Sequence, residues 1–221
     1  MASARASAVA PRERGFTDLI ALAERRLADA FGGRIARLYG WGIAGTYSLA
    51  LVLVSSRIES ILSQALVALA WIPAGLVALG AARDQARLDE ENGIAALVRQ
   101  RGFDARDLEL ARFFAAARRI AKTTGWPAFA LVLVSLARAR GMDAVLTSGT
   151  FALGACVFVL CLSLLLAALA RASAVVSSGR GRLVFTALVL VPHLAHSLFP
   201  WMPSVPRMLG HVLDIFFTGG E

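Results

Sequence analysis

A run of 27 residues, 144–170, contains no charged side chain. A helix needs about 20 apolar residues to cross the hydrocarbon core of a bilayer, so this run is long enough to span a membrane. Further uncharged runs at 39–54, 61–82 and 183–199 are separated by charged segments. The pattern predicts an all-α, polytopic integral membrane helix bundle.

The composition agrees with a membrane protein. Hydrophobic residues make up 57% of the chain and charged residues 17%. Soluble domains contain about 45–50% apolar residues and about 25% charged residues. An ordinary soluble enzyme and a disordered chain are both disfavoured. The net charge of +8 does not indicate nucleic-acid binding, because the basic residues lie between the apolar runs, where membrane orientation explains them. The expected partner is the lipid bilayer, and we expect no binding of nucleic acid.

Three parts are expected along the chain. Residues 1–15 are small, polar and basic, which predicts a disordered tail. Residues 16–38 carry an apolar stripe at helical spacing, which predicts an amphipathic helix in the membrane interface; a cytosolic helix packed on the rest of the protein is the alternative. Residues 39–218 are expected to form one transmembrane domain with a cytoplasmic segment at 83–122.

The number of spans is expected to be five or six. Pro73 predicts a kink in the second run. Residues 123–137 are too short for a span of their own, and they span only as the continuation of a helix that begins near Asp107. The last apolar stretch, 207–217, contains Asp214, so it is a short sixth span, a re-entrant helix or an interfacial helix.

The distribution of Arg and Lys predicts the orientation. The N-terminus, 83–122 and 171–182 together carry 19 of these residues, and the alternating segments carry 4. Loops rich in Arg and Lys stay in the cytoplasm. We therefore expect a multi-pass protein of a bacterial-type inner membrane with a cytoplasmic N-terminus.

The sequence offers little catalytic chemistry. His193 and His196 share a helix face and are able to hold a metal or haem, but no matching cluster occurs, so interfacial histidines are the favoured interpretation. Cys156 and Cys161 lie about 7.5 Å apart along a helix, beyond disulfide reach, and are expected to be buried thiols. No phosphate-binding loop motif is present. We expect no enzymatic activity, no cofactor and no metal.

The hydrophilic segment 83–122 is much longer than a connection between two spans requires. After a densely charged start, it contains a short amphipathic stretch that ends at Gly102. A second helix follows, with Asp104 as a candidate N-cap, and leads into the membrane. We expect two short helices here. The segment is interpreted as a docking surface for a cytoplasmic partner, and a solvated loop is the alternative.

This segment resembles the coupling region of the permease subunits of ABC-2 type transporters. There the pattern is roughly Glu-x-Gly-hydrophobic-x-x-Leu, a turn with Gly or Pro, and a helix with Ala-Arg. The order of helices over 16–199 is also similar, whereas the outer loop of about seven residues and the short final helix depart from the family. The corresponding places here hold Glu91, Gly93, Ile94, Leu97, Gly102, Ala111 and Arg112.

The resemblance implies a permease that forms a homo- or heterodimer, exports a substrate, and binds a separate ATP-binding subunit on 88–104. ATP hydrolysis would belong to that partner. The alternative is a non-transport membrane scaffold or assembly subunit of a larger membrane complex. The candidate docking residues are Asp89, Glu90, Glu91, Gly93, Ile94, Leu97, Gly102 and Arg112.

Overall fold

The computed structural model describes residues 15–27, 33–53, 58–83, 85–138, 142–177, 179–196, 201, 208 and 211. These residues form helices and turns, and no strand occurs among them. Three of the helices are long and apolar enough to cross a membrane: Ser60–Ala81, Ala105–Arg138 and Ser148–Val176. The prediction of an all-α fold with membrane-spanning helices is confirmed to this extent. The predicted tail before Gly15, and Asp214, lie outside the described residues.

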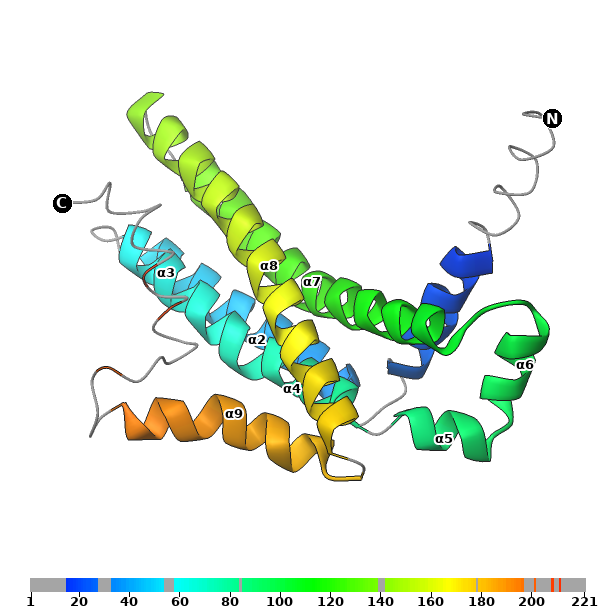
Figure 1. Cartoon of the computed structure of the whole chain (residues 1–221). Helices are drawn as coiled ribbons and strands as arrows, with labels where there is room; N and C mark the ends of the chain where they lie inside the picture. Colours follow the sequence, from blue (N-terminus) through cyan, green and yellow to red (C-terminus); the bar gives the residue numbers. More distant parts are fainter. Residues whose placement is uncertain are drawn as a thin grey trace, which may run out of the picture.

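The helices form a bundle built on one long antiparallel hairpin of α7 and α8 (Figure 1). Helix α2 packs along α7, and the second apolar run is divided into α3, η1 and α4. Helices α5 and α6 and the N-terminal helix lie at one end of the bundle (Figure 1). In order, the elements are the helix at 15–27, α2 (Gly33–Leu53), α3 (Ile58–Leu69), η1 (Ala70–Ala74), α4 (Gly75–Ala81), α5 (Gln85–Glu91), α6 (Ile94–Gln100), α7 (Ala105–Arg138), α8 (Met142–Val176) and α9 (Gly181–Ala195).

Helix α8 is apolar on every face. Its inner face buries Phe158 and Leu162, while Leu153 and Leu160 on the outer face are 64% and 59% exposed. A helix that presents leucines both inward and outward is typical of a membrane span, because lipid covers the outer face. Cys156 and Cys161 also lie on the exposed surface, so the expectation of buried thiols is wrong.

Helices α2 and α7 approach each other closely through small residues. Ala36, Gly40 and Ala44 recur every fourth position on α2 and are buried. A Cβ added to Gly40 would lie 3.1 Å from the Thr123 carbonyl oxygen and 3.3 Å from Pro127 Cγ. Small residues at such spacing let helix backbones meet in membranes. Helix α2 begins at Gly33, so residues 33–38 are part of this helix.

Several local predictions find a counterpart in the structure. The disruption expected at Pro73 is present as the π-helical turn η1. Helix α7 is continuous over 34 residues, about 51 Å, so the short apolar stretch does continue a helix that begins in the charged segment. The loop predicted over 171–182 is shorter, because α8 continues to Val176 and includes Arg171. Helix α5 was not expected as a separate element.

Candidate functional site

The three segments richest in basic residues meet at one end of the bundle. The helix at 15–27, the α5–α6 unit and the start of α7 lie there, together with the end of α8 and the start of α9 (Figure 1). The described parts of these segments therefore lie at the same end of the fold, and we call this region the charged end.

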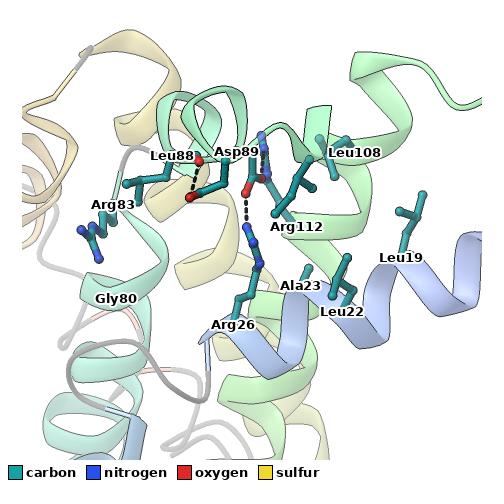
Figure 2. Close-up of a pocket in the computed structure, with 12 residues that line it drawn as sticks. Leu19, Leu22, Ala23, Arg26, Gly80, Arg83, Leu88, Asp89, Leu108 and Arg112 are labelled. Atoms are coloured by element: carbon teal, nitrogen blue, oxygen red, sulfur yellow. Dashed lines mark hydrogen bonds and ion pairs between the residues drawn. The ribbon is translucent and has the colours of Figure 1, made fainter. Parts of the chain in front are cut away.

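Asp89 of α5 is the centre of the charged end. Its side chain is 7% exposed, and it accepts hydrogen bonds from Arg26 of the N-terminal helix and Arg112 of α7 (Figure 2). The Arg112 side chain is itself 4% exposed. Burial of a charge is costly unless an opposite charge and hydrogen bonds compensate it, so these three groups depend on one another.

The same ion pairs continue toward α8. Arg112 also binds Glu109, one turn earlier in α7. Glu109 accepts a second hydrogen bond from Arg171 of α8, with Nη2 and Oε2 2.5 Å apart. Arg171 Nη1 donates to the Ala81 carbonyl oxygen at 3.2 Å, and that oxygen belongs to the last turn of α4, where carbonyls lack helical partners. We call Arg26, Asp89, Glu109, Arg112 and Arg171 the ion network.

A second set of contacts fixes the N-terminal helix against α7. Glu24 accepts a hydrogen bond from Lys122 Nζ at 2.5 Å and pairs with Arg118 at 3.5 Å. On its apolar face, Leu19 packs in a small core with Val98, Phe103, Leu108 and Ala111. The apolar face of residues 15–27 therefore packs on the protein, and its place in the membrane interface stays a prediction.

The two glycines of the predicted docking segment form its turns. Gly93 has φ +70° between α5 and α6, and Gly102 has φ +79° between α6 and α7. Side chains other than glycine rarely adopt these angles, so the residue type is set by the backbone. Between the turns, Ile94 packs half-buried against the small core and Leu97 is 59% exposed.

The predicted docking residues thus divide into two groups. Glu90, Glu91 and Leu97 are exposed, together with both glycines. Asp89 and Arg112 are interior members of the ion network. The structure brings these two together across 23 residues of sequence, and it separates them from the exposed surface of α5 and α6.

Three members of the ion network were not singled out from the sequence: Arg26, Glu109 and Arg171. The three-residue spacing of Glu109 and Arg112 is a local signal for a helical ion pair. Arg26 and Asp89 are 63 residues apart, and no local pattern links them. Arg171 follows a long uncharged run, and such a charge is ordinarily interpreted as the start of a loop.

A cavity of about 360 Å³ lies beside the ion network. Leu19, Leu22 and Leu108 line it with apolar surface, and Arg26 and Arg112 contribute polar surface (Figure 2). The Nε atom of Arg112 is buried and has no hydrogen-bond partner within the described part of the chain. The α5–α6 unit is therefore joined to the bundle by specific ion pairs beside this cavity.

The described residues hold no group of three or more His, Cys, Asp or Glu side chains that could bind a metal ion. His196 lies directly after α9. The side chain of His193 lies outside the described part of the structure. The interpretation of these two residues as interfacial histidines stays a prediction.

Comparisons with protein-family models, with curated proteins and with solved structures find no match to this chain. The resemblance to ABC-2 permeases therefore rests on the residues of the 88–104 segment and on the order of the helices.

Proposed function

We propose that this chain is the membrane-spanning permease subunit of an ABC-2-like exporter, and that a separate ATPase subunit docks on the exposed surface of α5 and α6. The observation that carries the proposal is the two-sided character of this unit. Glu90, Glu91 and Leu97 are exposed, while Asp89, one residue before Glu90, is bound inside the ion network. One short unit thus combines an accessible surface with a rigid connection to the bundle.

The ion network can transmit a displacement of α5 to the spanning helices α7 and α8. A displacement of Asp89 acts directly on Arg112 of α7, and Arg112 shares Glu109 with Arg171 of α8. The cavity beside these residues leaves space for such a displacement. A coupling segment in a transporter requires a connection to the spanning helices and space in which to move, since packed elements switch between discrete arrangements.

The orientation and span number that complete the proposal come from the sequence. The charged end faces the cytoplasm of a bacterial-type inner membrane, because alternate segments contain most of the Arg and Lys. Helix α2 and the shorter apolar helix at 181–192 join the three long helices as spans, which gives five. The segment at 207–217 adds a sixth. The permease is a dimer with the substrate path at the dimer interface.

The experiment that tests this function is purification of the tagged, full-length protein in a mild detergent, followed by mass spectrometry of the proteins that accompany it. The proposal predicts a stoichiometric subunit with nucleotide-binding motifs, whose ATPase activity changes on reconstitution with this chain. A stoichiometric set of membrane proteins without an ATPase would contradict it and would favour the scaffold or assembly subunit.

A further inference from the structure

A second cavity at the charged end, of about 390 Å³, has four arginines in its lining. It lies between Arg83, which is two residues after α4, helix α5 and the start of α9. Arg83, Arg87, Arg180 and Arg182 line it, and Glu91 is the acidic residue of the lining. The cavity is distinct from the one beside the ion network, although Arg83 and Leu88 border both.

The position of Gly181 explains how these arginines come together. A Cβ on Gly181 would lie 2.3 Å from the Ala82 carbonyl oxygen and 2.9 Å from Ala174 Cα. The start of α9 therefore rests directly on the end of α4 and on α8, a contact that only glycine permits. This contact places Arg180 and Arg182 beside Arg83.

The arginines that line this cavity outnumber its acidic residue four to one. Glu91 is engaged by Arg87, whose Nε lies 2.8 Å from Oε1. Among the described residues, the guanidinium groups of Arg83, Arg180 and Arg182 have no acidic partner, and the Nε of Arg182 is buried without a hydrogen bond. The first turn of α9 contains no acidic residue. Converging guanidinium groups bind phosphate oxygens with charge-assisted hydrogen bonds.

The cavity lies where lipid headgroups would be. Arg83 follows the candidate span Ser60–Ala81 by two residues, and Arg180 follows Ser148–Val176 by four. Directly beyond the arginines, α9 exposes apolar side chains, with Leu183 71% and Val191 53% exposed. An anionic headgroup held by the arginines would thus have its acyl chains along an apolar helix. Basic pockets between membrane helices bind anionic lipids in this way.

We propose that this cavity is a binding site for an anionic phospholipid, with the headgroup phosphate held by Arg83, Arg180 and Arg182 and the acyl chains against α9. The apolar surface of α9 favours a lipid over free phosphate, since a soluble anion would leave that surface uncovered. The inference does not depend on transport or on an ATPase, and either proposal can fail without the other.

The test measures thermal stabilisation of the delipidated, full-length protein in detergent by added ligand. The probes are phosphatidylglycerol, phosphatidylcholine with the same acyl chains, and inorganic phosphate. The variant Arg180→Gln/Arg182→Gln removes two of the arginines. The control variant Arg101→Gln/Arg106→Gln removes two exposed arginines from the same end of the bundle, outside the cavity.

Phosphatidylglycerol is expected to stabilise the native protein and the control variant, with phosphatidylcholine and inorganic phosphate much weaker. The cavity variant is expected to need about ten- to a hundredfold more phosphatidylglycerol, because two charge-assisted hydrogen-bond donors are lost. Equal stabilisation by both lipids, or an equal response of both variants, would overturn the proposal. Stabilisation by inorganic phosphate alone would also overturn it, because it would identify a soluble anion as the ligand.

Discussion

Arg171 of α8 and Glu109 of α7 form an ion pair across 62 residues of sequence, with Nη2 and Oε2 2.5 Å apart. This pair joins the C-terminal part of α8 to the N-terminal part of α7. Through Arg112, Glu109 also connects to Asp89 of α5. The candidate docking unit, the N-terminal helix and two long helices are therefore held by a single set of ion pairs, in which Asp89, Arg112 and Arg171 are buried.

Replacement of Asp89 by asparagine is expected to destabilise the protein by about 3 kcal/mol, because Arg26 would lose its ionic partner and the buried Arg112 would keep only Glu109. The free energy of unfolding can be measured in detergent by titration with denaturant and circular dichroism. Glu91→Gln is the control, since it removes an exposed helical pair worth only about 0.3–0.5 kcal/mol. Equal effects of the two changes would contradict the structural role assigned to the ion network.

Gly40 and Gly42 form a matched pair for testing the contact between α2 and α7. Gly40→Ala is expected to lower stability by about 1–2 kcal/mol, because the new methyl group would press on the Thr123 backbone and on Pro127. Gly42 meets nothing within 4 Å, so Gly42→Ala is expected to leave stability unchanged or to raise it by up to about 1 kcal/mol. Thermal unfolding of the two variants in the same detergent decides the point. A tolerated Gly40→Ala would show that the two helices do not meet there.

The charged end is expected to lie in the cytoplasm. A reporter fused after residue 60 should be located outside the cytoplasm, and one fused after residue 100 inside, because the second fusion point lies within the segment richest in Arg and Lys. Enzymatic reporters that are active on one side only give the answer in whole cells. The reverse pair of locations would overturn the proposed topology.

Features that depend on local pattern could be predicted from the sequence. Long uncharged runs predicted the apolar helices, and the need to complete a short span predicted the continuity of α7. The glycines at 93 and 102 were assigned to the docking segment, and the structure adds that both adopt positive φ.

Features that depend on tertiary contacts could not be predicted. Arg171 looked like the start of a loop, but Glu109 and the Ala81 carbonyl stabilise it inside α8. Asp89 was grouped with the exposed acids, although Arg26 and Arg112 hold it in the interior. The exposure of Cys156 and Cys161 follows from which face of α8 meets α7, and an almost uniformly apolar helix carries no pattern from which to infer that face.

We propose that the exposed surface of α5 and α6 binds an ATPase subunit. The most direct measurement is the molar ratio of ATPase to this chain after co-purification of the native protein, Glu90→Lys/Glu91→Lys, and the control Asp18→Lys, which changes an exposed acid on the N-terminal helix. We predict that the double variant loses the ATPase by about tenfold or more, since reversed charges at a docking surface are strongly unfavourable. The control should retain the ATPase, and all three proteins should insert equally. An unchanged ratio in the double variant would contradict the claim.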